Sequence, residues 1–393
     1  MATDVDHIVL GAGLSGLLLT RALLTDADRH RAGARVLLVD PRPAQGRRLT
    51  YAYWSRRPTS LDRWAVGSWD VLRVVARDGQ TADLALGDWR YSAIDWGRGR
   101  AELLDEVAAD PRVRLVAEPA DRLRDGPDSV SVRAGGRWIS GRWLYDSRPP
   151  SLSALPRRRA RCSSQSLVQV FRGLWITSDR GSIDASAATL LDFSADHGDD
   201  LAFTYVLPTS ATSAMVMAVR MGLQPDEPDP APAVRRLVAG EPWTAVAEES
   251  GATPLLMPPP PRRLGPRVLA IGQRGGRVRP STGYAVRRIL ADTDAIRRSL
   301  IQHGHPFDLP ADPRWQRPLD AIWLRALSHE GADLQAAFAS LVTRAPIDTV
   351  LRFLDGDAST RDLATVIGSL PPRPFIRALL PLRMGDGVGR RRS

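Results

Sequence analysis

The apolar and polar positions near the start of the chain predict an α/β unit. An apolar run at residues 7–10 leads into a glycine-rich segment, and leucines follow at helical spacing over 17–24. A second apolar run at 35–39 is followed by Asp40. Strand, glycine turn, helix and strand in this order make one βαβ unit, which begins a parallel sheet.

Further along the chain the pattern changes twice. Residues 41–70 are rich in Arg, Trp and Pro and are expected to be irregular, and a helix is expected at 92–107. From residue 166 short apolar runs alternate with turn residues, which predicts an antiparallel sheet. A helix is expected at 233–249, with a break at Gly240. Further strands are expected at 113–116, 130–132, 143–146 and 268–272, and helices from residue 284 onward.

Three glycines in the first turn have separate tasks in binding a dinucleotide. Gly11 permits a tight turn, Gly13 lets a diphosphate approach the backbone, and Gly16 lets the helix pack on the strand. The helix N-terminus then offers N–H groups and a positive dipole end to the phosphates. Asp40 lies where its carboxylate can accept hydrogen bonds from ribose hydroxyls.

FAD is the dinucleotide that the sequence favours. The first glycine turn lies at the start of the chain, and a second one follows the apolar run at 268–271. FAD proteins of this type have such a turn near the C-terminus, where it covers the flavin. Gly275 and Gly276 are therefore expected to approach the diphosphate or isoalloxazine end of FAD.

The predicted fold class is α/β. It comprises an FAD-binding, Rossmann-like domain of the glutathione-reductase type, an inserted antiparallel substrate-facing sheet and a helical C-terminal part. The length of 393 residues fits two or three packed subdomains. The expected segments are 1–150 and 263–300 for the FAD-binding domain, 151–262 for the antiparallel domain, and 301–393 for the helical region.

Charge and composition narrow the partners. The formal net charge is +10 and all 54 basic residues are arginine, so no lysine Schiff base or lysine general base exists. The charge favours anionic partners. Only 6% of residues are aromatic and no basic stripe is interleaved with them, so nucleic acid is not an expected partner. The single cysteine, Cys162, excludes an intrachain disulfide and a cysteine-based zinc site.

The sequence predicts a cytoplasmic protein and leaves contact with a membrane surface open. Its start shows no charged-then-apolar signal, and no apolar stretch is long enough to span a bilayer. Residues 374–383 mix apolar residues with arginines, which fits either peripheral membrane contact or packing of the tail on its own domain. His303 and His305 lack an acidic or cysteine partner at ligand spacing, so no metal site is expected. The oligomeric state is left open.

Several segments together resemble the bacterial lycopene β-cyclases, which are flavoproteins of carotenoid synthesis. The most specific is Pro-Ser-Thr-Gly-Tyr at residues 280–284, which a common two-domain flavin hydroxylase is not expected to carry. The matching segments extend along nearly the whole chain, at 6–16, 51–55, 61–64, 146–149, 191–193, 203–208, 275–284 and 353–356.

The resemblance implies a redox-neutral isomerisation of a lipophilic polyene or prenyl chain. In this family one end of a linear polyene is protonated, the cation closes a six-membered ring, and a proton leaves. The flavin has to be reduced, by a donor such as NADPH, and stabilises the cation or relays the proton. Such a site needs an acid kept protonated in apolar surroundings and a dry cavity.

The chain departs from the family at the catalytic acid. The family's glutamate lies in the strand after the Tyr-Val-Leu-Pro segment at 205–208, and Met217 occupies its position. Methionine cannot donate a proton. Asp192 and Tyr205 are the candidate replacements; their structural alternatives are a strand-turn carboxylate and a core tyrosine. Arg274, where the family has a small residue, would favour the anion of a reduced flavin.

Four functions stay open at this point. The chain is a polyene cyclase with a replaced acid, a diverged member acting on another prenyl chain, an FAD-dependent oxidoreductase or monooxygenase, or a flavin-binding protein without catalysis. The intact glycine turns argue against the last. Trp54, Trp64 and Trp69 are expected either to line a polyene cavity or to pack in a core.

Overall fold

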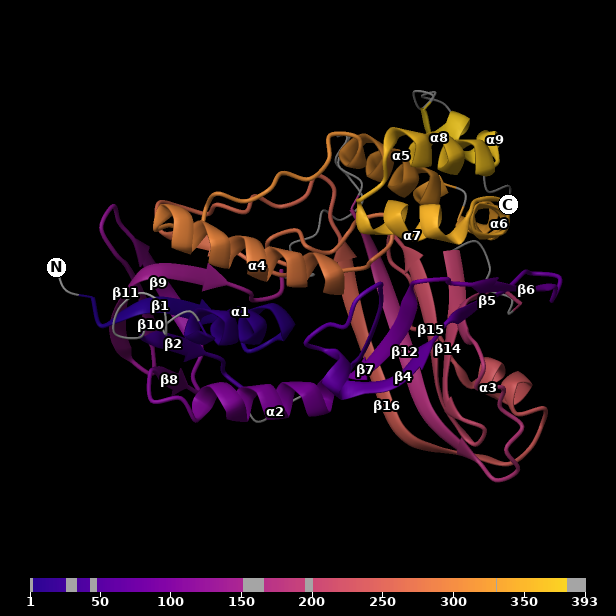
Figure 1. Cartoon of the computed structure of the whole chain (residues 1–393), viewed down its shortest axis with the longest axis horizontal. Helices are drawn as coiled ribbons and strands as arrows, with labels where there is room; N and C mark the ends of the chain where they lie inside the picture. The colour runs from indigo at the N-terminus through magenta and orange to yellow at the C-terminus, as the bar shows by residue number, and fades with distance from the viewer. Residues whose placement is uncertain are drawn as a thin grey trace, which may run out of the picture.

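The computed structural model describes residues 3–25, 34–42, 48–150, 166–194, 201–329 and 331–379. Three sheets and a group of C-terminal helices make up the described part of the chain (Figure 1). The α/β fold class is confirmed. Cys162 and the tail from residue 380 onward lie outside the described residues.

The first sheet contains the expected βαβ unit. β1 (Val5–Leu10) pairs in parallel with β2 (Val36–Val39), and α1 (Leu14–Thr25) lies between them in the chain. All four residues of β2 are buried, which explains its unbroken apolar run. The order of the sheet is β8 (Val113–Val116), β2, β1, β11 (Arg137–Asp146), β10 (Val130–Ala134) and β9 (Ala120–Asp125), and β17 (Val268–Ala270) pairs with β11.

Helices cover one face of this sheet. Leucines of α1 pack with apolar residues of β1, β2 and β17 in one buried cluster. The same cluster includes residues of α2 (Trp96–Ala108) and of α4 (Val286–His303). Figure 1 shows these three helices beside the sheet, on the left of the molecule.

The second sheet has seven strands and extends through the other half of the molecule (Figure 1). Its central strands pair antiparallel, as predicted. One face packs against the C-terminal helices, and the other packs against α3 (Ala231–Leu237). Its order is β16 (Trp243–Leu255), β12 (Leu167–Ser178), β15 (Ser213–Gly222), β14 (Leu201–Ser210), β13 (Ala188–Asp192), β5 (Val71–Val75) and β6 (Thr81–Ala85).

The predictions of an irregular segment at 41–70 and of a helix at 233–249 are wrong, and the helix predicted at 92–107 is shifted. Part of the segment 41–70, predicted irregular, forms β3 (Thr50–Ser55) and β4 (Ala65–Trp69), which flank β7 (Arg90–Asp95) in a third sheet. Of the three tryptophans in this segment, Trp54 and Trp69 are buried strand residues, and Trp64 is buried in a short 3₁₀ turn between β3 and β4. The helix expected at 92–107 therefore begins later, at Trp96.

The helix expected at 233–249 ends early. It stops at Leu237, and Gly240 has a left-handed backbone with φ of +81°. The chain then pairs with β12 along the whole of β16, so pairing to a long partner strand overrides the helical pattern of Ala and Glu residues. The expected boundary at residue 150 also does not separate the sheets, because β5 and β6 belong to the second sheet.

Five helices gather over one end of the second sheet (Figure 1). Among the described residues, no helix is both long and apolar enough to cross a bilayer. These helices are α5 (Gln316–His329), α6 (Gly331–Arg344), α7 (Ile347–Asp355), α8 (Thr360–Ser369) and α9 (Pro372–Leu379).

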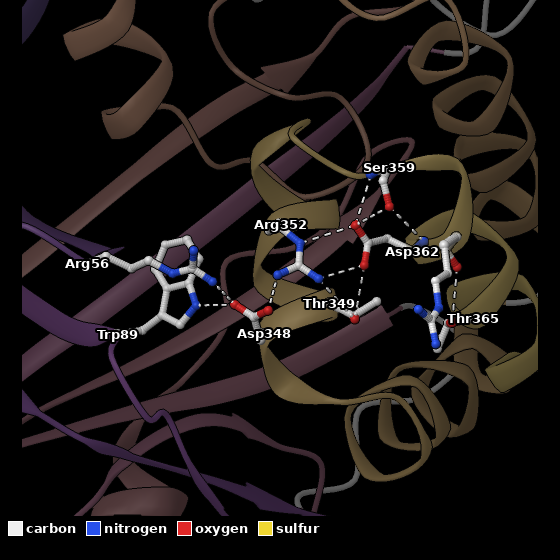
Figure 2. Close-up of polar contacts among 9 residues, drawn as sticks. Arg56, Trp89, Asp348, Thr349, Arg352, Ser359, Asp362 and Thr365 are labelled. Carbon is white, nitrogen blue, oxygen red and sulfur yellow. Dashed lines mark hydrogen bonds and ion pairs between the residues drawn. The ribbon is translucent and has the colours of Figure 1, made fainter.

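A polar network fixes two of these helices to each other and to the strands. Figure 2 shows Arg352 of α7 between Asp348 and Asp362, with which it forms ion pairs. Asp348 also accepts a hydrogen bond of 2.7 Å from the Trp89 indole N–H. Asp362 and Ser359 form a capping box at the start of α8. The network holds the helical part in a fixed position over the sheet.

Candidate cofactor and substrate site

The first glycine turn has the geometry that binding a diphosphate requires. Gly11 has a left-handed φ of +96°, which favours glycine. A Cβ on Gly16 would lie 2.0 Å from the Gly11 carbonyl oxygen, so α1 approaches the turn closely only because the side chain is absent. A Cβ on Gly13 would have no atom within 4 Å, which leaves open space beside the N-terminus of α1. A phosphate group fits this space.

Asp40 holds the turn from the end of β2. Its Oδ2 accepts a hydrogen bond of 2.7 Å from the Ala12 N–H, and its Oδ1 accepts one of 2.8 Å from the Arg42 N–H. Arg100 donates from Nε to the Ala12 carbonyl at 2.9 Å and approaches Asp40 Oδ2 at 3.9 Å. This arginine, which the sequence pattern did not single out, places a positive charge beside the turn.

The second glycine turn lies directly against the first. It follows β17, which pairs in parallel with β11. A Cβ on Gly272 would lie 2.2 Å from the Ser15 Oγ in the first turn of α1, and one on Gly275 would lie 2.4 Å from the Ala270 carbonyl oxygen. Gly276 has a left-handed φ of +69°. The predicted residues Gly275 and Gly276 follow Gly272 in the same turn, and Gly272 is the residue of this turn that lies against Ser15.

Asp146 contacts the second turn, and the next residue, Ser147, contacts the start of the first. Asp146 ends β11, and only 2% of its side chain is exposed. It forms ion pairs with Arg148 at 2.8 Å and with Arg274 at 2.9 Å. Ser147 donates from Oγ to the Leu10 carbonyl at 2.7 Å. The unusual Arg274 is thus held at the carboxyl ends of the parallel strands, beside both turns.

Met217, the predicted position of the family acid, lies on the face of the second sheet that packs against the C-terminal helices. Met217 of β15 is buried there and is the cross-strand partner of Tyr205 on β14. The Tyr205 hydroxyl lies 3.4 Å from the hydroxyl of Tyr284, which ends the Pro-Ser-Thr-Gly-Tyr segment. Burial raises the pKa of Tyr205 to about 12 and the pKa of Tyr284 well above its usual value. Both phenols are therefore protonated at neutral pH.

Asp192 lies on the opposite face of the same sheet. Its Oδ1 accepts a hydrogen bond of 2.8 Å from the Ser194 N–H, and its Oδ2 lies 3.6 Å from Arg236 of α3. α3 packs on the face that carries Val206 and Val216, away from Met217. The structure brings Tyr205 and Met217 together and separates Asp192 from both.

Two buried carboxyls that were not singled out by the sequence lie near the tyrosines or Met217. Asp355 lies in segment 353–356, which resembles the family, but the sequence did not mark it as a candidate site residue. It accepts a hydrogen bond of 2.8 Å from the Trp54 indole N–H and pairs with Arg287 at 3.0 Å, while burial raises its pKa to about 7. Glu249 of β16 is 4% exposed. It lay within the predicted helix, so its place on the sheet could not be foreseen.

The three tryptophans have different surroundings. Trp54 packs edge-on against Tyr284, with ring centroids 4.7 Å apart, and lies at the site. Trp64 packs against Trp96 and donates a hydrogen bond of 2.7 Å to a glutamate of α2, so it belongs to the core of the first domain. Trp69 is buried in the main core, next to the ring of Tyr91.

An apolar cavity of about 330 Å³ lies among helices α5 to α9. Aromatic and aliphatic side chains form nearly all of its wall, and Asp320 with Ser281 and Thr282 forms the polar part. A smaller cavity contains Tyr205 and Tyr284 and shares Thr282, Phe338, Leu341 and Leu354 with the larger one. The two cavities therefore adjoin, and the larger leads towards the tyrosines.

Comparison with solved structures shows a fold shared with flavoproteins. A geranylgeranyl bacteriochlorophyll reductase-like protein from Thermoplasma acidophilum matches with a TM-score of 0.58 and 12% identity, over 95% of this chain and 98% of that one. The p-nitrophenol 4-monooxygenase PnpA from Pseudomonas putida matches with a TM-score of 0.59 and 14% identity, over 92% and 100%. The rebeccamycin biosynthetic enzyme RebC, solved with reduced flavin, matches with a TM-score of 0.55 and 17% identity, over 94% and 74%.

Sequence comparison identifies the family. No curated protein matches the chain significantly. The family model described as lycopene cyclase protein matches residues 6–380, which is nearly the whole chain. The chain therefore belongs to the lycopene cyclase family.

Proposed function

We propose that this protein binds FAD and catalyses the redox-neutral ring closure of a polyene or polyprenyl chain, begun by protonation. One observation carries the proposal. In a member of the lycopene cyclase family, a large apolar cavity adjoins buried tyrosines at the position of the family's acid. A long hydrocarbon chain can pack against such a wall, because few polar groups of the wall would lose a hydrogen-bond partner.

The residues present fit FAD. The N-terminus of α1 and the open space at Gly13 would hold the diphosphate, and Asp40 would accept from the ribose. Gly275 and Gly276 would lie along the other end of the cofactor. Gln169 Oε1 is buried without a hydrogen-bond partner beside residues 280–284, so a donor on the flavin would satisfy it.

The protein's own residues exclude water and stabilise positive charge. The wall of the large cavity offers water almost no hydrogen-bond partners, so a carbocation there is protected from quenching. Tyr205 and Tyr284 present aromatic rings to the smaller cavity, and ring faces attract cations. When bound and reduced, for which NADPH is a suitable donor, the flavin supplies negative charge near the cation.

The methionine at the acid position favours a substrate that differs from lycopene. Met217 makes the sheet face more apolar than a glutamate would, and a changed acid accompanies a changed substrate geometry. A shorter prenyl chain closing one ring is therefore the second candidate. An oxidative reaction is the third, because the fold is shared with a monooxygenase.

The substrate enters from a membrane surface in this proposal. Ile367, Ile376 and Leu379 line the large cavity and are also 58%, 54% and 61% exposed, so the cavity reaches an apolar patch on α8 and α9. Exposed apolar side chains on a helix that also carries Arg373 suit the boundary of an anionic bilayer.

Replacing Gly13 with alanine tests the cofactor site. The protein should fold, because nothing lies within 4 Å of the new Cβ. The Cβ would occupy the space for the phosphate and keep it from one backbone N–H, so FAD should bind about ten- to a hundredfold more weakly, as for one hydrogen bond to a charged group. Fluorescence titration of the apoprotein measures this. The matched control is Gly368→Ala, which also has open space. Equal FAD affinity for both variants would contradict the assignment.

Product mass tests the reaction. Purified protein with FAD and a reductant is incubated with lycopene and, separately, with shorter prenyl chains, and products are identified by mass spectrometry. A cyclised product with the mass of its substrate is expected. Gain of oxygen or loss of hydrogen would support the oxidative alternative, and FAD binding without any product would support a non-catalytic protein.

Replacing Ile376 with aspartate tests membrane entry. Flotation with liposomes of phosphatidylcholine and phosphatidylglycerol should weaken by about tenfold, the cost of about 1.5 kcal/mol for losing one buried isoleucine. Ile301→Asp is the control, since Ile301 is 52% exposed on α4, outside the patch. Wild-type protein that does not float, or the same loss in both variants, would count against this route.

A further inference from the structure

A glycine brings the position of the family acid next to a buried glutamate. Gly173 of β12 is the cross-strand partner of Met217 on one side and of Glu249 on the other. A Cβ on Gly173 would lie 3.1 Å from Glu249 Cγ and 3.3 Å from Met217 Cε. Both side chains therefore lie over Gly173 on the same face of the sheet, and they share the space that its missing side chain leaves.

The surroundings of Glu249 hold its carboxyl in place, and its burial favours the neutral acid. The Thr50 N–H donates to Oε2 and the Thr50 hydroxyl to Oε1, each at 2.6 Å. Burial raises the pKa of Glu249. A hydroxyl can accept as well as donate, so Thr50 can also hold the neutral carboxyl.

The charged groups around Glu249 act on its pKa in opposite directions. Arg48 attracts the carboxylate, whereas Asp95 opposes its charge. The Arg48 guanidinium lies 3.6 Å from Asp95 and over the ring of Trp175 at 4.7 Å. Its positive charge therefore interacts with Asp95 and the Trp175 ring as well as with Glu249. Tyr51, whose pKa burial raises to about 12, is neutral.

We propose that Glu249 is the acid that begins ring closure, in place of the glutamate that Met217 replaces. The inference rests on the proposed function. The O–H bond of Glu249 breaks, and the π electrons of the terminal alkene form the new C–H bond. The cation closes the ring, and the Glu249 carboxylate takes the proton that the ring releases, so the acid is regenerated without an external oxidant or reductant.

The other candidate acids are less suited to this step. Tyr205, with a pKa of about 12, is too weak an acid to protonate an alkene. Asp192 lies on the other face, against Arg236. Burial also raises the pKa of Asp355, but Asp355 is held by Arg287 and Trp54, and it is not among the side chains that lie over Gly173 beside Met217.

The test compares Glu249→Gln with Glu248→Gln in the full chain with FAD. The amide keeps a partner for Thr50 but cannot donate the proton. The control residue is next in sequence, is exposed and pairs with Arg172 at 2.6 Å. Ring closure should fall by about 10²- to 10⁴-fold in the first variant and stay unchanged in the second. Met217→Glu added to Glu249→Gln should restore activity, because it returns an acid to the same space.

A second measurement does not depend on turnover. An infrared pH titration of the protein without substrate should show a protonated carboxyl band that persists above the usual pKa of glutamate and is absent in Glu249→Gln. Wild-type ring closure should fall as pH rises through the same value. The proposal is overturned if Glu249→Gln keeps ring closure or if no such band disappears. Wild-type protein that closes no ring refutes the proposed function, and the infrared result then still decides whether this carboxyl holds a proton.

Discussion

The parallel pairing of β11 with β1 on one side and β17 on the other is the constraint on which the site depends. It brings two glycine turns from distant parts of the chain to the same ends of the strands. At that edge Asp146 carries the counter-charge for Arg148 and Arg274, and the two turns touch at Ser15 and Gly272. Asp146 pairs with Arg274 of the second turn, and the neighbouring Ser147 donates to the Leu10 carbonyl at the start of the first, so the end of β11 contacts both turns.

In the proposed reaction the second sheet supplies the reacting surface, and glycines on its strands shape that surface. Gly173 opens a space that Met217 and Glu249 fill from opposite sides, and Gly251 leaves room for the ring of Phe171. The methionine has a chemical consequence beyond removing an acid. Its apolar side chain is part of the low-dielectric surroundings that raise the pKa of the neighbouring carboxyl. In the proposed reaction, the acid predicted at Met217 and the acid function of Glu249 on the next strand but one are thus linked.

The two glycine turns could be predicted from sequence, because local rules govern them. Gly11 and Gly16 are determined by the backbone of the first turn, and Gly276 has the left-handed φ that favours glycine in the second. Family membership followed from segments along the whole chain.

The catalytic half depends on long-range pairing, which a local pattern does not encode. The segment holding Glu249 has the composition of a helix, and only its pairing with β12 makes it a strand. Asp192 was chosen because its segment resembles the family, but the face of the sheet on which it lies depends on strand register. A shift of register by one residue moves every side chain of a strand to the other face. The Thr50 contact joins residues 199 positions apart.

Isotope labelling of the product tests the central claim, that the reaction begins with a proton from the protein. The carboxyl proton exchanges with solvent. Turnover in D₂O should therefore place one deuterium in the product for each ring formed. That deuterium stays on the protonated carbon, and the proton that leaves comes from the substrate. Mass spectrometry with fragmentation locates it. One deuterium for each ring and no other mass change is the predicted result, and a cyclised product without deuterium, or one that has gained oxygen, contradicts the account.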